Sequence, residues 1–285
     1  MIFRAALIQM CSGRDMARNV ADASDMIRHA HGQGAEFVST PEMTNILEPD
    51  RTRLRALARA EHEDASVRAF CDLAGEVGIW LNIGSLALSD GTGRLLNRSL
   101  LISPRGSIVA RYDKIHLFDV DLPTGESLRE SHAYDAGRTA TVATWRWGQL
   151  GMTICYDVRF PALYRQLAQA GAEVLTIPSA FTVPTGEAHW HVLLRARAIE
   201  TGSFVLAAAQ AGRHESGRET YGHSLAVGPW GDILAEAQTK PEVIVFDVDK
   251  RQADAARKRI PALARTDGFT LENLKVTGRI ASFPT

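Results

Sequence analysis

A single cysteine ends an apolar run in the middle of the chain, in a setting typical of a catalytic nucleophile. Cys155 directly follows the run 151–154, and Pro161 then opens a segment with leucines four residues apart, Leu163 and Leu167. Proline is well tolerated in a first helical turn, so we expect Cys155 at the tip of a sharp strand-to-helix turn, with an exposed side chain. Such a turn can lower the thiol pKa and hold a developing oxyanion on backbone N–H groups. The alternative is a cysteine packed in the core, which is common for unpaired cysteines.

Two further residues have the types and positions that the rest of this chemistry needs. Glu42 follows a short apolar segment stopped by Pro41, where a desolvated carboxylate can take the proton of a thiol. Lys114 ends another apolar segment, where an ammonium can stabilise an oxyanion and lower a thiol pKa. Taken singly, each also fits a solvated surface residue. The candidate histidines have no compelling spacing to Cys155; they are His116, His189, His191 and His223.

The apolar patterns predict which elements position these residues. Strand patterns cover residues 3–11, 37–40, 79–88, 95–103, 107–112, 139–147, 149–154, 174–177, 204–210 and 243–248, with a hairpin over 224–237. Helical patterns cover residues 16–32, 67–77, 162–170, 187–201 and 250–259. Residues 49–60 are polar and favour a surface helix or loop. The longest irregular stretch, 113–138, is of a length that usually carries function or is disordered.

A long-period repeat relates the two halves of the chain. Residues 34–41 (GAEFVSTP) match residues 171–178 (GAEVLTIP), and residues 104–110 (PRGSIVA) match residues 229–235 (PWGDILA) in the same order. Two copies of an open sheet with helices on one side each leave one sheet face bare, and packing these faces together buries both. The repeat therefore predicts a four-layer α-β-β-α sandwich of the α/β class with an internal pseudo-twofold, formed by residues 1–285 as a single domain.

The composition is that of an ordinary globular protein. The 285 residues are 45% apolar and 23% charged with a net charge of −1, which argues against a nucleic-acid partner. No stretch approaches the length of a membrane span, and the N-terminus does not have the pattern of a signal peptide. Three cysteines without motif spacing argue against a disulfide framework or a zinc cluster. We therefore expect a cytoplasmic protein without a metal or another cofactor.

Three motifs together resemble the nitrilase superfamily of carbon–nitrogen hydrolases. They are Pro41-Glu42-Met43, the run 112–119 (YDKIHLFD) around Lys114, and the run 154–161 (ICYDVRFP) around Cys155. The resemblance covers nearly the whole chain and implies the same α-β-β-α sandwich. It implies Glu42 as general base, Lys114 as oxyanion stabiliser and Cys155 as nucleophile. It also implies a second glutamate that orients Lys114 or the attacking amine, for which Glu130 fits better than Glu126.

Further motifs are similar to the branch that contains deaminated glutathione amidase and omega-amidase. They are the runs 178–181 (PSAF), 185–190 (TGEAHW), 194–200 (LRARAIE), 209–214 (AQAGRH) and 221–224 (YGHS). The sequence departs from the branch at Glu187, where proline is usual. Arg159 is placed to bind a substrate carboxylate in a bidentate manner, or else to form an ion pair within the fold, with Asp157 as the candidate partner. We expect the backbone N–H of Tyr156 to be a second oxyanion donor, and Phe181 to line the acyl pocket or the core.

The expected reaction is hydrolysis of a small carboxylate-bearing linear amide through a cysteine thioester, with deaminated glutathione as the favoured kind of substrate. Alternatives within the superfamily are an omega-amidase acting on alpha-ketoglutaramate, an N-carbamoyl amino acid amidohydrolase and a nitrilase. A catalytically silent binding protein on the same fold is the alternative of another class. A metal site at His116, Asp119 and Asp121 is weak because it lacks a fourth ligand of evident spacing. The family tends to dimerise through a helical face, so we expect a homodimer or higher homo-oligomer.

Overall fold

Two six-stranded sheets form the centre of the computed structural model, which describes residues 1–121, 125, 127–265 and 268–272. The strands of the first sheet follow the order β16-β1-β2-β3-β4-β5. Their bounds are β1 (Ile2–Gln9), β2 (Phe37–Ser39), β3 (Trp80–Ser89), β4 (Leu95–Ile102), β5 (Ile108–Asp113) and β16 (Glu242–Asp249). The second sheet follows the order β8-β9-β10-β11-β14-β15. Its strands are β8 (Thr141–Trp145), β9 (Gly148–Met152), β10 (Val174–Thr176), β11 (Phe204–Ala207), β14 (Leu225–Val227) and β15 (Ile233–Glu236).

The two sheets have the same internal pattern, which confirms the predicted repeat. Three parallel strands stand at the centre of each sheet, β1-β2-β3 in the first and β9-β10-β11 in the second. Each trio continues on one side into two antiparallel strands, β4-β5 or β14-β15, and meets one antiparallel strand on the other side, β16 or β8. The matched sequence segments therefore occupy equivalent strands, β2 with β10 and β5 with β15.

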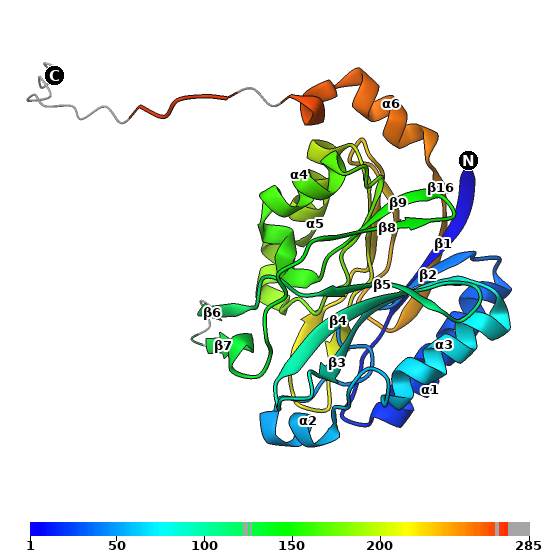
Figure 1. The fold of residues 1–285 in the computed structure, drawn as a ribbon, viewed down its shortest axis with the longest axis vertical. Coiled ribbons are helices and arrows are strands. Elements are labelled where there is room, and N and C mark those ends of the chain that lie inside the picture. Colours follow the sequence, from blue (N-terminus) through cyan, green and yellow to red (C-terminus); the bar gives the residue numbers. More distant parts are fainter. Residues whose placement is uncertain (122–124, 126, 266–267, 273–285) are drawn as a thin grey trace, which may run out of the picture.

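Helices cover the outer face of each sheet, giving the α-β-β-α order of layers (Figure 1). The helices α1 (Met16–Gly32) and α3 (Ala65–Val77) lie on the first sheet, and α4 (Pro161–Gln169) and α5 (Val183–Thr201) lie on the second. The short α2 (Arg51–Leu57) follows β2, and α6 (Arg251–Arg259) with the 3₁₀ turn η3 (Pro261–Ala264) follows β16. None of the helices described is both long and apolar enough to cross a membrane.

The alternation of side chains along β1 shows how the layers are held together. Phe3, Ala5 and Leu7 belong to the cluster that includes residues of the second sheet, whereas Ala6 and Ile8 belong to the cluster formed with α1 and α3. Because successive side chains of a strand point to opposite faces, a strand between two layers is apolar throughout. This accounts for the nearly unbroken apolar run at the start of the chain.

The elements differ from the sequence prediction in a few places. Part of the stretch 113–138 is regular: β6 (Asp119–Asp121) pairs with β7 (Ser127–Arg129), and the 3₁₀ turn η1 (Glu130–His132) follows. The helix expected at 187–201 begins earlier, at Val183, because Pro184 occupies its first turn, where proline costs no hydrogen bond. A small sheet of β12 (Ala211–Arg213) and β13 (Glu219–Tyr221) was not predicted. Such short strands carry too few residues for a visible alternation.

Candidate active site

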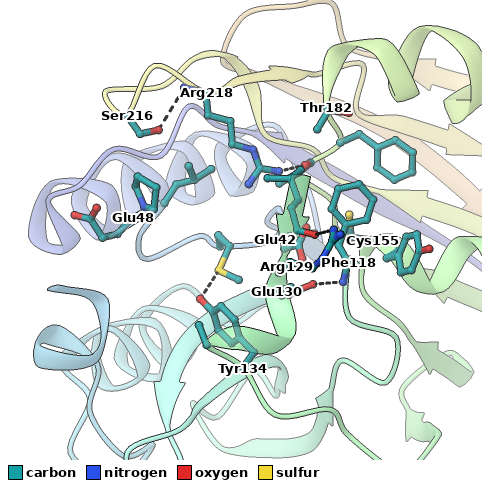
Figure 2. A pocket seen from close by; sticks show the side chains of 18 of the residues that line it. Glu42, Glu48, Phe118, Arg129, Glu130, Tyr134, Cys155, Thr182, Ser216 and Arg218 are labelled. Carbon is teal, nitrogen blue, oxygen red and sulfur yellow. Dashed lines mark hydrogen bonds between the residues drawn. The ribbon is translucent and has the colours of Figure 1, made fainter. Parts of the chain in front are cut away.

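All seven residues that the sequence singled out line one cleft of about 700 Å³ (Figure 2). They are Glu42, Lys114, Glu130, Cys155, Tyr156, Arg159 and Phe181. They come from both halves of the repeat, since Glu42 follows β2 and Cys155 follows β9. The carboxyl ends of these strands therefore meet at one edge of the sandwich, as expected for ligand sites in open α/β sheets. Glu126, the weaker candidate for the second glutamate, lies outside the described residues.

The turn that carries Glu42 is fastened to the neighbouring strand β3. The N–H of Ser85 donates to the carbonyl of Pro41 at 3.2 Å, and the N–H of Thr44 donates to the carbonyl of Ser85 at 2.9 Å. The N–H of Met43 donates to the hydroxyl of Ser85 at 2.9 Å. Met43 has a φ of 57°, a left-handed conformation that is costly for a side chain without a local polar group. The hydrogen bonds to β3 thus compensate for the strained backbone at Met43, and this backbone directs Glu42 into the cleft.

Cys155 lies at the predicted sharp turn between a strand and a helix. After β9 the chain enters the 3₁₀ turn η2 (Cys155–Arg159), and α4 begins at Pro161. Cys155 itself has a φ of 50°, and its N–H donates to the carbonyl of Pro178 at 2.9 Å. The N–H of Tyr156 belongs to the first turn of η2, where N–H groups have no partner within the helix. That N–H is therefore in a position to serve as an oxyanion donor.

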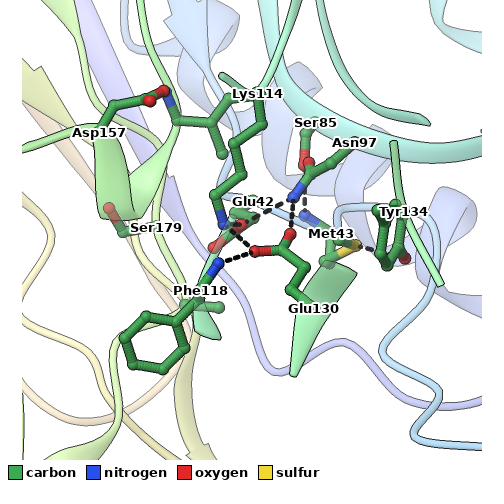
Figure 3. A network of polar contacts seen from close by, with 12 residues as sticks. Glu42, Met43, Ser85, Asn97, Lys114, Phe118, Glu130, Tyr134, Asp157 and Ser179 are labelled. Atoms are coloured by element: carbon green, nitrogen blue, oxygen red, sulfur yellow. Dashed lines mark hydrogen bonds and ion pairs between the residues drawn. The ribbon is translucent and has the colours of Figure 1, made fainter. Parts of the chain in front are cut away.

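A network of charges surrounds the side chain of Lys114 (Figure 3). Its Nζ lies 2.8 Å from Oε1 of Glu42 and 2.8 Å from Oε2 of Glu130. Nδ2 of Asn97 donates to both carboxylates, each at 2.9 Å. The N–H of Phe118 donates to Oε2 of Glu130 at 2.7 Å. Lys114 is 2% exposed and Glu42 is 4% exposed, so this network is screened from bulk water.

Burial and neighbouring charges determine the protonation states of Lys114 and Glu42. Burial opposes the charge of Lys114, but the carboxylates of Glu130 and Glu42 outweigh it and hold the pKa of Lys114 well above its usual value. Burial likewise opposes the charge of Glu42, but the charge and hydrogen bond of Lys114 outweigh it, and the pKa of Glu42 is lowered. The resting site therefore holds an ammonium and a carboxylate.

The pKa of the Cys155 thiol, in contrast, is shifted in the direction that favours its neutral form. Burial is the main reason that the pKa of Cys155 is raised, and the negative charge of Glu42 raises it further. The charge of Lys114 and the backbone of Ala180 lower this pKa, but by less. The prediction of a lowered thiol pKa is therefore wrong. The prediction of an exposed side chain is also wrong, because Cys155 is only 7% exposed. Because the sulfur rests as a thiol, its proton must leave as it attacks, and Glu42 is the carboxylate beside it.

The three predicted binding residues lie close to one another in the cleft. The guanidinium of Arg159 lies 5.9 Å from the ring centre of Tyr156 and 5.6 Å from that of Phe181. Its Nη2 lies 3.3 Å from Nδ1 of His189. Within the part of the chain that the structure describes, no carboxylate forms an ion pair with Arg159, so the alternative of a pair with Asp157 does not hold. Glu187 is exposed in α5 and does not line the cleft.

Sequence reasoning missed two residues that position the site. Asn97, on β4, joins Glu42 to Glu130 as described above. Asp157 is fully buried and accepts hydrogen bonds from the N–H of Ile154 at 2.9 Å and from the hydroxyl of Tyr112 at 2.7 Å. Its Oδ1 also lies 2.7 Å from Nδ1 of His116. Asp157 thus ties the Cys155 turn to the segment that carries Lys114, and its place in the motif around Cys155 was the available signal.

The weak metal site suggested by the sequence does not form. His116 pairs with Asp157, as just described. Asp119 accepts the N–H of Ser131 at 3.0 Å, and Asp121 pairs with Arg129 at 2.7 Å. These three side chains therefore have separate partners and do not converge on a common point.

Comparisons with known proteins agree with this geometry. The sequence model of the family described as carbon–nitrogen hydrolase matches residues 4–258. The chain is 38% identical over 261 residues to a deaminated glutathione amidase of Yersinia enterocolitica, covering 90% of this chain and 91% of that protein.

Two solved structures give the same result for the fold. The NitFhit protein of C. elegans superposes with a TM-score of 0.86 at 35% identity, over 92% of this chain and 64% of that longer chain. A mutant amidase from Nesterenkonia sp. AN1, with acrylamide added at its active-site cysteine, superposes with a TM-score of 0.76 at 28% identity, over 91% of this chain and 98% of that chain. Family model, relative and structures coincide over most of the chain: it belongs to the carbon–nitrogen hydrolase family of the nitrilase superfamily and is a hydrolase of carbon–nitrogen bonds.

Proposed function

We propose that this protein hydrolyses a small, linear amide bearing a carboxylate, through a thioester on Cys155, and that its substrate is deaminated glutathione or a close analogue. One observation carries the proposal. The buried carboxylate of Glu42 adjoins both the ammonium of Lys114 and the thiol of Cys155 in a single cleft. A binding protein on the same fold has no use for this combination of groups.

In the first half of the reaction, Glu42 takes the thiol proton while the sulfur attacks the amide carbonyl carbon. The carbonyl oxygen becomes an oxyanion, which receives hydrogen bonds from Lys114 and from the N–H of Tyr156. Glu130 contacts Lys114 and Asn97 contacts Glu42, and these contacts keep both side chains in position during this step. Collapse of the intermediate breaks the carbon–nitrogen bond, and Glu42 gives its proton to the leaving nitrogen. Ammonia or an amine departs and the acyl group remains on sulfur.

In the second half, the same groups act on water. Glu42, again a carboxylate, removes a proton from a water molecule as that water attacks the thioester carbonyl. The oxyanion forms in the same place and is stabilised by the same donors. When it collapses, the sulfur leaves and regains a proton from Glu42, which restores the resting thiol. The products are a carboxylic acid and the amine or ammonia.

The surroundings of Arg159 support this class of substrate. Arg159 has its guanidinium against two aromatic rings and no carboxylate partner among the described residues, so it is available for a carboxylate of the substrate. The relative in Yersinia enterocolitica is named for its action on deaminated glutathione, a linear amide with free carboxylates. Alpha-ketoglutaramate, N-carbamoyl amino acids and nitriles are the competing substrates within the same superfamily.

A substrate panel combined with mass spectrometry tests this proposal. We expect faster release of ammonia or amine from deaminated glutathione than from alpha-ketoglutaramate, N-carbamoyl amino acids or simple nitriles. Rapid quenching is expected to reveal an acyl adduct on the peptide that contains Cys155. Cys155→Ala should abolish both signals, whereas Cys11→Ala and Cys71→Ala serve as matched controls that retain them. Turnover without an adduct at Cys155, or undiminished turnover in Cys155→Ala, contradicts the mechanism; a different preferred amide changes only the substrate.

We also propose a homodimer in a reducing compartment such as the cytoplasm. All three cysteines are free. Exposed apolar side chains lie on one face of α5, in the turn between β14 and β15 and at the start of β15: Val192, Ile199, Trp230 and Ile233. Val192 and Ile199 are seven residues apart and share that face of the helix. A face of this kind supports a contact between two copies of the chain.

A further inference from the structure

Three potential metal ligands lie together outside the cleft, where the second sheet meets α5. They are His191 in the middle of α5, His223 just before β14, and Glu236 at the end of β15. One ligand atom of each lies within 4.8 Å of the corresponding atom of the other two. The reaction proposed above uses none of them, and the YGHS motif at 221–224 has no other assigned role.

The spacing of these atoms suits a small divalent cation. Oε1 of Glu236 lies 2.8 Å from Nε2 of His191 and 3.0 Å from Nδ1 of His223. In a tetrahedral zinc site with bonds of about 2.0 Å, neighbouring ligand atoms are about 3.3 Å apart. To hold an ion, the two contacts to the carboxylate must lengthen by a few tenths of an ångström, and the two imidazole nitrogens, which lie within 4.8 Å of each other, must come to the same spacing. Two imidazoles and one carboxylate are a ligand set that zinc accepts, with a fourth position left for water.

The backbone holds the two histidines in place without help from a metal. His223 has a φ of 54°, a left-handed conformation that only a few per cent of non-glycine residues adopt. Its N–H donates to the carbonyl of Gln238 at 2.9 Å, and its carbonyl accepts from Nε1 of Trp190 at 2.7 Å. Trp190 directly precedes His191, so this bond also fixes the helix relative to His223. A third tie is the bond of 2.7 Å from Nε of Arg195 to the carbonyl of Gly231.

The site is reachable from solvent, which distinguishes it from a sealed ion-pair network. The side chains of His191, Glu236 and His223 are 32%, 28% and 19% exposed. Partial exposure lets a hydrated ion enter and leaves room for its remaining water ligand.

We propose that His191, His223 and Glu236 bind a divalent transition metal ion, with Zn²⁺ as the best fit, which ties α5 to the β14–β15 hairpin. In this role the ion stabilises the contact between these two elements, and the proposed amide chemistry does not use it.

Zinc titration of the full-length protein tests the site. The protein is stripped with a chelator, and its three thiols are alkylated so that cysteine cannot contribute ligands. Titration in competition with a chromophoric chelator should show one tightly bound Zn²⁺ per chain. Co²⁺ in place of Zn²⁺ should give the visible bands of a tetrahedral site. An excess of Zn²⁺ at about a hundred times its Kd should raise the melting temperature by about 5 °C.

Matched variants then identify the ligands. His191→Gln keeps a hydrogen-bonding group beside Glu236 but removes the imidazole, and Glu236→Gln removes the charge. Each should weaken zinc binding at least about tenfold and cancel the rise in melting temperature. His62→Gln, at an 80% exposed histidine far along the chain, should leave both unchanged. Metal-free melting curves of the variants check that they remain folded.

Two results overturn the site. One is the absence of saturable, stoichiometric zinc binding by the alkylated wild-type protein. The other is a His191→Gln variant that folds and binds zinc as tightly as the wild type. If a variant does not fold, the Co²⁺ spectrum of the wild-type protein decides, because an octahedral spectrum is not compatible with the proposed tetrahedral site.

Discussion

Lys114 stands between two carboxylates, and this one placement determines the charge state of the residues that would perform the chemistry. Glu42 and Glu130 each lie 2.8 Å from its Nζ. Lys114 keeps Glu42 ionised in spite of burial, while Glu42 in turn helps to keep Cys155 protonated. In the resting site the general base is therefore already ionised, whereas the thiolate forms only when the substrate is attacked.

The pH profile of the wild-type protein should reflect this arrangement. The pKa of Glu42 lies below its ordinary value of 4.5, so the carboxylate is present throughout the weakly acidic range. The pKa of Cys155 lies above its ordinary value of 9.0, so the thiol keeps its proton through the weakly alkaline range. We expect kcat/KM for the best amide to vary less than about twofold between about pH 5.5 and 8. A limb centred near pH 6.5 would instead indicate a histidine base.

Replacing Lys114 by methionine removes both the oxyanion donor and the charge that keeps Glu42 ionised. We expect kcat to fall by about 10²–10³ and the remaining activity to require a higher pH, because burial then raises the pKa of Glu42. Leaving the buried carboxylate of Glu42 and the partly buried one of Glu130 without their partner should lower the free energy of unfolding by about 3–5 kcal/mol. Initial rates at several pH values and urea denaturation measure the two effects.

The matched control is Lys240→Met, at an exposed lysine. It should change neither rate nor stability. An activity of Lys114→Met within tenfold of the wild type would exclude Lys114 as the oxyanion donor.

At the scale of elements, a bulge in β3 brings the two halves of the site together. The register between β3 and β4 shifts between Ile83 and Leu86, which leaves Gly84 and Ser85 out of the regular ladder. Ser85 holds the Glu42 turn, and Gly84 packs against the segments that follow β2 and β10. A Cβ at position 84 would lie 2.1 Å from the carbonyl oxygen of Thr40 and 2.5 Å from Cβ of Pro178. Bulges next to active sites commonly redirect a side chain in this way.

Gly84→Ala should therefore damage both stability and activity. The added methyl group has no space, and the backbone that carries Glu42 must move away from β3. We expect a loss of about 3 kcal/mol in the free energy of unfolding and a fall in kcat of at least about tenfold. Denaturant titration and steady-state rates check this.

Gly32→Ala is the matched control for this prediction, because a Cβ at position 32, at the end of α1, meets no atom within 4 Å. It should leave kcat unchanged and keep or slightly raise stability. A Gly84→Ala variant as stable and as active as Gly32→Ala would show that position 84 does not pack tightly against Thr40 and Pro178.

Comparison of these elements with the sequence shows what could be predicted and what could not. Glu42 and Cys155 were predictable because each directly follows a recognisable apolar strand. Asn97 was not, because within β4 it reads as one polar residue of an alternating strand, and its partners Glu42 and Glu130 are 55 and 33 residues away along the chain. The direction of the thiol pKa was also unpredictable, since it depends on burial and on the distance to Glu42 rather than on residue type.

At the scale of the whole molecule, the internal repeat was sufficient to predict the sandwich and the meeting of the strand ends. The two sheets share one core: Phe3 of β1 packs against Trp147, with ring centres 4.4 Å apart, and Phe37 of β2 packs against Trp145, with ring centres 4.9 Å apart. We propose on this basis that the chain folds as one domain. The repeat does not identify the surface for a second copy, because exposed apolar residues on one helix face become apparent only in the folded structure.

The proposed homodimer gives a prediction at this scale. Ile199→Glu places a charge in the centre of the apolar face of α5, and we expect it to convert the dimer into a monomer. Light scattering coupled to size-exclusion chromatography measures this directly. Val109→Glu, at an exposed valine of β5 in the other half of the molecule, should remain dimeric. A wild-type monomer, or an Ile199→Glu dimer, contradicts the proposal.

The protonated state of the buried sulfur has a consequence for survival under oxidative stress. Peroxide attacks thiolates in preference to thiols, so cysteines with low pKa values are the first to be oxidised in a stressed cell. Cys155, whose pKa is raised, offers peroxide little thiolate while the cleft is empty. An enzyme built in this way can continue to clear its amide during an oxidative burst that silences enzymes with permanently ionised cysteines.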